Sequence, residues 1–178
     1  MLPRIIGVFK LDANTFEEIE HDQGATGQAA IIVVIVALVS AIGSGIGASL
    51  NPELGGTFLS NSLVTFIGTL IGWVLWSGIT YLVGTSVFGG EADMGEMLRV
   101  IGFAFAPQLL GIIPFIGACI GGIWSLVAGF IAVRQGLDLT TGKAIATILI
   151  GFIVYAALLC GLLSVVGGLG ALTGAMSQ

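Results

Sequence analysis

Residues 89–114, GGEADMGEMLRVIGFAFAPQLLGIIP, decide how this chain folds. The stretch begins as a polar, acidic segment, passes through a single base, Arg99, and becomes a hydrophobic run interrupted by Pro107 and Pro114. A polar segment that leads through one arginine into an apolar run is typical of a chain entering a bilayer. Pro107 is expected to kink the helix and to free the carbonyl of Phe103, four residues earlier.

The composition of the whole chain indicates a membrane protein. Of its 178 residues, 56% are hydrophobic and only 8% are charged, whereas soluble domains carry about 25% charged residues. Ten acids against five bases give a net charge of −5, which argues against nucleic-acid binding because phosphates require clustered Lys and Arg. Cys119, Cys160 and the single histidine, His21, have no metal-ligand spacing, so we expect no cofactor and no metal.

Three long apolar runs predict membrane-spanning helices. Residues 29–50 contain 22 residues without a charge, enough to cross a hydrocarbon core of about 30 Å at about 1.5 Å per residue. Residues 62–88 form the second run and residues 144–169 the last. Proline and glycine breakers predict a loop over residues 51–61.

Two shorter apolar segments, residues 98–113 and 115–133, lie between these runs and are joined at Pro114. At 16 and 19 residues they are near the lower limit for spanning. We expect two short crossings with a tight turn, and a re-entrant hairpin is the alternative. The predicted fold class is therefore all-α: a polytopic membrane helical bundle of about five transmembrane helices.

The first ten residues predict an amphipathic helix that lies on the membrane surface. Apolar residues recur there at helical spacing, with Arg4 and Lys10 among them. Residues 1–28 contain no apolar core of the signal-peptide type, so we expect the N-terminus to be retained and cytoplasmic.

A polar, acidic collar is expected between this helix and the first span. Asn14 or Thr15 is predicted to cap a helical turn, and Gly24 and Gly27 are predicted to end it. The alternative is a metal site, because Glu18 and His21 have the Glu-x-x-His spacing of di-iron bundles. Such a site requires further carboxylates from other helices, and the later spans carry none in their apolar interiors.

Small residues at a spacing of four predict faces on which helices pack closely. They occur in the first span and in the segment after Pro114, at Gly43, Gly47, Gly117, Gly121, Ser125 and Gly129. The second span is rich in Ser and Thr. These hydroxyls favour bonding to helix backbones over a polar path, since no ionisable group lies at depth.

The bases predict how the chain is oriented. With five crossings they all fall on one side, which by the positive-inside rule is cytoplasmic: Arg4, Lys10, Arg99, Arg134 and Lys143. The N-terminus is then inside and the C-terminus outside, and a re-entrant hairpin gives the same result with three crossings. We expect these five side chains to contact lipid headgroups, and Arg99 either to do so or to pair with Glu96.

Six features follow one another along the chain: FGG, an acidic linker, LRVIGFAFAPQLLGIIPFIG, an apolar helix, a GLDLT turn and a lysine-alanine helix start. This order resembles the YIP-domain family (Ypt/Rab-interacting proteins). The resemblance covers residues 29–170 and leaves residues 1–28 as an N-terminal region and 171–178 as a polar tail. It rests on Gly89, Gly90, Arg99, Gly102, Pro107 and Pro114. It implies a five-helix membrane domain with a cytosolic N-terminus.

In eukaryotic members the resemblance further implies roles in membrane traffic and contact with Rab-type GTPases. This chain has a very short N-terminal region and lacks the Asp-Leu-Tyr-Gly-Pro motif of those members, so a Rab-type partner is not expected. The compact form resembles the prokaryotic branch, which implies the prokaryotic cytoplasmic membrane.

The functional hypothesis is a non-enzymatic scaffold or accessory subunit that packs against other integral membrane proteins or itself. The alternative is a small permease or channel for an unidentified solute, suggested by the hydroxyl-rich second span and the proline-broken third. An intramembrane enzyme is a weaker hypothesis, because candidate nucleophiles such as Ser77 and Cys160 have no His, Asp or Lys at depth to activate them.

Overall fold

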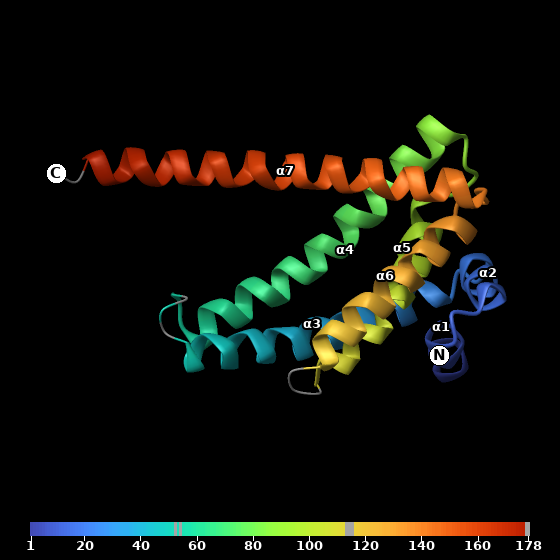
Figure 1. The fold of residues 1–178 in the computed structure, drawn as a ribbon, viewed down its shortest axis with the longest axis horizontal. Helices are drawn as coiled ribbons and strands as arrows, with labels where there is room; N and C mark the ends of the chain where they lie inside the picture. The colour runs from blue at the N-terminus through green and yellow to red at the C-terminus, as the bar shows by residue number, and fades with distance from the viewer. Residues whose placement is uncertain (52, 54, 113–115, 177–178) are drawn as a thin grey trace.

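The computed structural model describes residues 1–51, 53, 55–112 and 116–176, and in these residues the chain is helical with short connections and no strand (Figure 1). Pro114 lies outside the described residues. The elements are α1 (Leu2–Phe9), α2 (Ala13–His21), α3 (Ala25–Leu50), α4 (Phe58–Phe88), α5 (Met94–Ala104), the 3-10 helix η2 (Ala106–Ile112), α6 (Gly117–Gln135) and α7 (Thr141–Met176).

The polar collar is more ordered than the sequence predicted. Asp12, not Asn14 or Thr15, caps α2, because its carboxylate accepts a hydrogen bond from the backbone N–H of Asn14 at 3.1 Å. Neither predicted glycine ends this helix. Gly24 is the N-cap of α3 and has an ordinary right-handed conformation, and Gly27 lies inside α3. One glycine costs a helix only about 1 kcal/mol, which the long apolar run that follows offsets.

The helices α3 and α4 form an antiparallel hairpin (Figure 1). Each begins four residues before its predicted start: the first turn of α3 consists of small and polar residues, and in α4 Ser60 and Asn61 separate Phe58 and Leu59 from the apolar run. At the start of α4, Thr57 and Ser60 form a capping box. The helices approach closely at Gly45, where an added Cβ would clash with the hydroxyl oxygen of Ser62.

The segment that contains Pro107 is broken rather than kinked. The helix α5 begins at a capping box formed by Asp93 and Glu96 and ends at Ala104, and the chain continues as η2. Proline has no N–H and its ring excludes the carbonyl four residues earlier, so the α-helix stops before Pro107 and the tighter 3-10 geometry takes over. The expected kink is therefore wrong.

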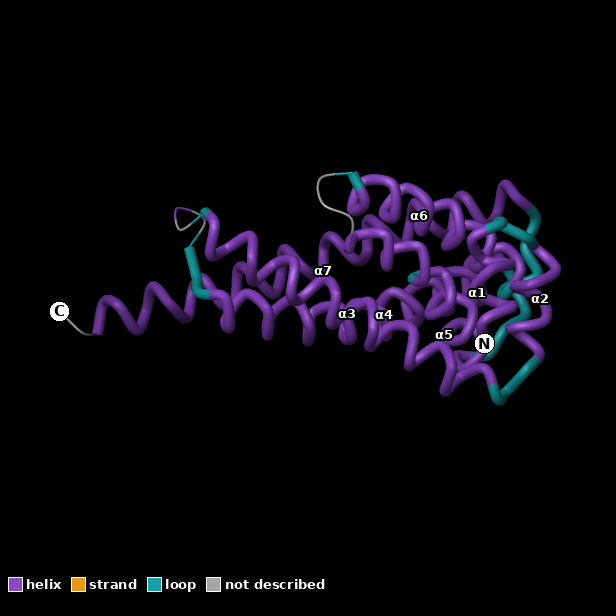
Figure 2. The backbone as a smooth tube through the Cα atoms, turned by 90° about the horizontal axis from the view of Figure 1, so that it is seen from below, coloured by secondary structure: helices purple, strands orange, loops and turns teal. Residues whose placement is uncertain are grey.

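The segment η2 packs antiparallel against α6 (Figures 1 and 2). Gly121 allows the contact, since a Cβ there would lie 2.6 Å from the carbonyl oxygen of Pro107.

Four helices are long and apolar enough to cross a membrane: Ala25–Leu50, Phe58–Phe88, Gly117–Gln135 and Thr141–Gly161. Their outward faces carry exposed Ile, Leu, Val and Phe, as expected for helices in lipid. This confirms the predicted all-α, polytopic membrane fold, with α5 and η2 as an additional broken segment.

The helix α7 crosses α4 and then extends beyond the rest of the bundle (Figure 1). Near the crossing, the ring of Trp76 on α4 lies 4.7 Å from that of Phe152 and 6.1 Å from that of Tyr155. The two helices diverge past these contacts.

The core lies at the opposite end from the C-terminus, where α1 and α2 cover the starts of α3 and α5 and the end of α6 (Figure 2). Phe16 and Ile19 of α2 pack there with Met97, Phe103 and Leu137, and all five are almost completely buried. This packing brings the polar ends of five helices together.

Candidate functional site

Arg99 is buried beneath α2 and is only 5% exposed. Its Nε and Nη2 atoms donate hydrogen bonds of 3.0 and 2.6 Å to the main-chain carbonyl oxygen of Glu20, near the end of α2. The predicted pairing with Glu96 is present as a weaker contact, with 3.9 Å between nitrogen and oxygen. Arg99, expected near headgroups, thus satisfies a helix-end carbonyl and fixes α2 to α5.

The side chain of Glu20 is 4% exposed, and its Oε2 atom is buried without a hydrogen-bond partner. The pKa of this carboxyl is raised to about 7, first by burial and then by the negative charge of Asp138; His21 lowers it, and Glu96 and Glu17 raise it by smaller amounts. The pattern of apolar and acidic residues contains a signal for this burial. Phe16, Ile19 and Glu20 are spaced i, i+3 and i+4 on one helix face.

The other four bases lie at the same end of the molecule as Arg99. Arg4 forms ion pairs with Glu18 at 2.9 Å and Asp22 at 2.7 Å. Lys143 donates a hydrogen bond of 2.9 Å to the carbonyl oxygen of Phe88, at the end of α4. Lys10 and Arg134 are exposed.

The alternative of a metal site at Glu18 and His21 gains no support from their contacts. Glu18 accepts hydrogen bonds from Arg4, and the Nδ1 atom of His21 lies 2.9 Å from the carbonyl oxygen of Glu17. Throughout the part of the chain that the structure describes, no three His, Cys, Asp or Glu residues are arranged to hold a metal ion.

Three glycines within residues 89–102 shape this polar end: one adopts a left-handed backbone conformation and two allow close packing. Gly89 ends α4 with a φ of 67°, a conformation that L side chains rarely adopt. Gly90 leaves room for Leu137, whose carbonyl oxygen would lie 2.8 Å from an added Cβ. Gly102 leaves room for Ala29, because a Cβ added at Gly102 would lie 2.8 Å from the Cβ of Ala29. Pro107 is buried in η2.

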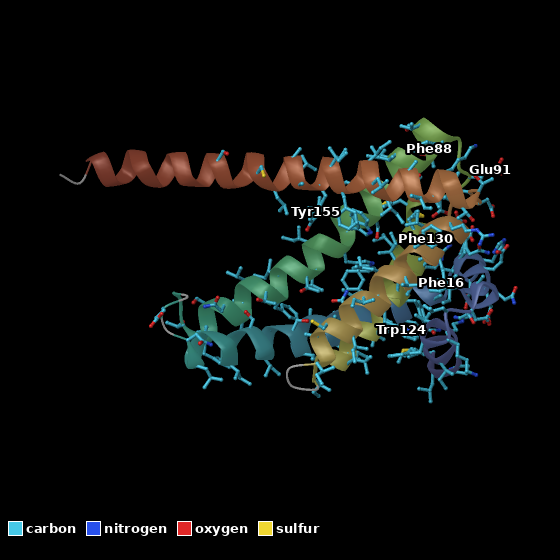
Figure 3. All side chains as sticks on the ribbon, viewed as in Figure 1. Phe16, Phe88, Glu91, Trp124, Phe130 and Tyr155 are labelled. Atoms are coloured by element: carbon cyan, nitrogen blue, oxygen red, sulfur yellow. The ribbon has the colours of Figure 1, made fainter. Side chains whose placement is uncertain are left out.

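A groove of about 680 Å³ lies between α4, the α5–η2 segment, α6 and α7. Its walls are mostly apolar, with Phe130 on α6 and Tyr155 on α7 (Figure 3). Polar side chains in the lining come from Thr65, Thr69, Gln108, Ser125 and Tyr155. The hydroxyl oxygen of Ser125 is buried and has no hydrogen-bond partner.

The predicted helix-packing residues fall into two groups. Gly117 and Gly121 are buried at the start of α6, whereas Ser125 and Gly129 line the groove. A Cβ at Gly129 would meet no atom within 4 Å.

On α3, a Cβ added at Gly43 or Gly47 would likewise meet no atom within 4 Å in the described part of the chain, so neither glycine marks a close helix contact there. Gly45, between them, makes the close contact with α4 and was not among the predicted packing residues. It shares a helix face with Ala41, four residues earlier, and that spacing was the available signal.

Comparison with known proteins identifies the family of the chain. The Yip1 domain matches residues 6–166, a range that takes in part of α1 and all of α2. No curated protein matches the chain, and no solved structure does. Because the family match covers most of the chain and the helices are long and apolar enough to span a membrane, this protein is a multi-pass membrane member of the Yip1 domain family.

Proposed function

We propose that this protein is a non-enzymatic scaffold or accessory subunit that binds a transmembrane helix of another integral membrane protein in the groove between α4, α6 and α7. The observation that carries the proposal is the groove itself, which combines apolar walls, several glycines and one buried polar atom without a hydrogen-bond partner, the hydroxyl oxygen of Ser125.

The size of the groove fits a helix. An α-helix about 10 Å wide that rises about 5.4 Å per turn occupies roughly 420 Å³ per turn. The groove of about 680 Å³ therefore accepts more than one turn.

Glycines make both walls shallow enough for a helix backbone to approach. Gly68 of α4 and Gly122 and Gly129 of α6 line the groove, and a Cβ at any of them would meet no atom within 4 Å. Small residues permit close backbone contact between membrane helices. Gly43 and Gly47, on the outer face of α3, offer a second such surface, which is available to a partner or to another copy of this chain.

Polar atoms at this depth favour a partner that carries a polar residue. The hydroxyl of Ser125 has no partner within the chain, and Gln108 lines the same groove. An interhelical hydrogen bond in a membrane contributes about 0.6–2 kcal/mol. Such a bond would align the partner helix in the groove.

The composition of the groove supports a role in binding rather than in catalysis. Among its lining residues there is no Asp, Glu, His, Lys or Arg, so the Ser and Thr hydroxyls there have no neighbouring base that would activate them.

The charges support an orientation with α1 and α2 in the cytoplasm. All five bases belong to the end of the molecule that carries α1 and α2, and the positive-inside rule places that end inside. The C-terminal end of α7 is then outside, in what we propose is a prokaryotic cytoplasmic membrane. The exposed Lys10 and Arg134 would contact lipid headgroups, and a Rab-type GTPase is not the proposed partner.

The test is extraction in a mild detergent, followed by sizing and mass spectrometry of copurifying membrane proteins. Gly129→Leu and Gly122→Leu fill the groove and are expected to lose the partner. Gly161→Leu is the matched control, since Gly161 is exposed on α7 outside the groove with open space around it. A partner that is retained by both groove variants, or no partner at all, would contradict the proposal.

The polar lining also gives a specific reason to test a small permease. Thr65, Thr69 and Gln108 could contact a solute in the same groove. Flux through vesicles that contain the purified chain, blocked by Gly129→Leu, would favour this second function over the first.

A further inference from the structure

The helices α1 and α2 form one unit, residues 2–21, that lies over the polar end of the bundle. Within the unit, Arg4 of α1 is paired with Glu18 of α2. Three side chains attach it to the rest of the chain through four hydrogen bonds: two from Arg99 to the carbonyl oxygen of Glu20, one from Trp124 Nε1 to the carbonyl oxygen of Phe9, and one from Gln135 Nε2 to Glu17 Oε2. We call residues 2–21 the N-terminal flap.

Glu20 is the weak point of this attachment. Its side chain is almost completely buried, Oε2 has no hydrogen-bond partner, and among the residues that the structure describes its carboxylate forms no ion pair. Arg99, the nearest buried base, uses its N–H groups on the main-chain oxygen of Glu20 and not on its carboxylate. An ionised carboxylate buried without a partner opposes docking.

The charged groups around Glu20 reinforce this effect. Asp138, from the loop after α6, Glu96 of α5 and Glu17 of α2 face it with negative charge, and His21 is the neighbouring positive group. Of the remaining bases on the packed elements, Arg4 is already paired and Lys10 and Arg134 are exposed. Ionised Glu20 is therefore held among acids.

We infer that the N-terminal flap is a proton-controlled element: it is docked on α5 and α6 while Glu20 is protonated, and it is released when Glu20 ionises. Release would uncover the buried faces of α5 and α6 at the polar end of the bundle. The inference concerns residues at that end and does not depend on the groove having a partner.

The direction of the pH dependence follows from the difference in the pKa of Glu20 between the docked and the released flap. The pKa of Glu20 is raised from 4.5 to about 7 in the docked state. The docked state then binds more protons, so docking is strongest below pH 4.5 and weakens as the pH rises to about 7. Between pH 6 and pH 8 the docking equilibrium should weaken by about tenfold.

Hydrogen exchange of the full chain in lipid nanodiscs tests the inference directly. Protection of the amides of residues 13–21, corrected for intrinsic exchange at each pH, should fall by about tenfold from pH 6 to pH 8. Glu20→Gln keeps the size of the side chain without its charge and should retain protection at pH 8. Glu91→Gln is the matched control and should behave like the unmodified chain, because Glu91 is exposed and is not among the groups that shift Glu20.

Two further variants keep the test decisive if Glu20→Gln fails to fold. Asp138→Asn removes a neighbouring charge at a residue whose φ is 50°, a conformation that Asn tolerates. It should reduce the loss of protection at pH 8. His21→Gln should leave the pH dependence largely in place. The inference is overturned if protection does not change with pH in the unmodified chain, if Glu20→Gln or Asp138→Asn leaves the full dependence, or if His21→Gln abolishes it.

Discussion

At the residue scale, Arg99 shows how a single base can organise a helix end. The last carbonyls of a helix have no partner within it, and the guanidinium of Arg99 satisfies the carbonyl of Glu20 with two hydrogen bonds. Lysine would carry the same charge but cannot reproduce this planar, two-point contact. Position 99 therefore requires the shape of arginine as well as its charge.

We expect Arg99→Lys to destabilise the protein by about 1.5–3 kcal/mol, the contribution of hydrogen bonds to charged groups. Thermal unfolding in detergent measures the change. Arg134→Lys is the control. Arg134 is exposed, and surface substitutions of this kind change stability by less than about 0.5 kcal/mol. Equal effects of the two variants would show that charge alone matters at position 99.

Gly102 provides a second prediction at this scale, because an added Cβ would lie 2.8 Å from that of Ala29 and 3.2 Å from the Nε1 of Trp73. Gly102→Ala should cost about 1–3 kcal/mol through overpacking. Gly43→Ala, in open space on α3, should instead stabilise by up to about 1 kcal/mol through helix propensity. Thermal unfolding of each variant measures the change. If both substitutions raised, or both lowered, the unfolding temperature relative to the unmodified chain, this account would be contradicted.

The sequence was most informative where one residue type has one physical role. Gly89 was identified by a family pattern, and the structure supplies the reason, a left-handed helix end. Glu20 was missed because acidic residues are usually solvated. Its spacing from Phe16 and Ile19 places it on the apolar face of α2, but the residues of α5 and of the loop after α6 that surround it are far away in sequence and cannot be derived from α2 alone.

At the element scale, hydropathy located the long helices but not their first turns. The helix α4 begins at Phe58, with Thr57 and Ser60 as its capping box, four residues before the apolar pattern becomes clear. Residues 98–113 were predicted as one kinked segment, yet α5 stops at Ala104 and η2 follows. Proline predicts an interruption, but whether a helix bends or ends depends on its neighbours. Here α6 packs on η2 at Gly121.

The attachment of α1 gives the prediction that belongs to this scale. The indole of Trp124 on α6 donates a hydrogen bond of 2.9 Å to the carbonyl oxygen of Phe9 at the end of α1. Trp124→Phe removes the donor but keeps an aromatic ring, and it should increase hydrogen exchange of residues 2–9 by about fivefold, equivalent to roughly 1 kcal/mol.

Ile123→Leu, a conservative change at the exposed neighbouring position, serves as the control for Trp124→Phe. It should leave the exchange of residues 2–9 unchanged. Unchanged exchange in Trp124→Phe itself would mean that α1 is held by its apolar contacts, such as buried Val8, rather than by this hydrogen bond.

At the scale of the whole molecule, charge is concentrated at one end. All five bases and nine of the ten acids belong to α1, α2, α5, the end of α6, the start of α7 and the segments that join them, whereas Glu53 lies in the connection between α3 and α4. The net charge of this end is −4, from five bases and nine acids. Acids contribute little to membrane orientation, however, so the five bases should still place this end in the cytoplasm.

Thiol labelling in intact cells measures this orientation. In a chain with Cys119→Ala and Cys160→Ala, Lys10→Cys should react with a membrane-impermeant reagent only after the membrane is opened, because α1 is expected inside. Glu53→Cys, in the connection between α3 and α4, should react in intact cells. Both native residues are exposed, so both introduced thiols are accessible to the reagent on their own side. The reverse pattern would place the acidic end outside, where Glu20 would respond to external rather than cytoplasmic pH.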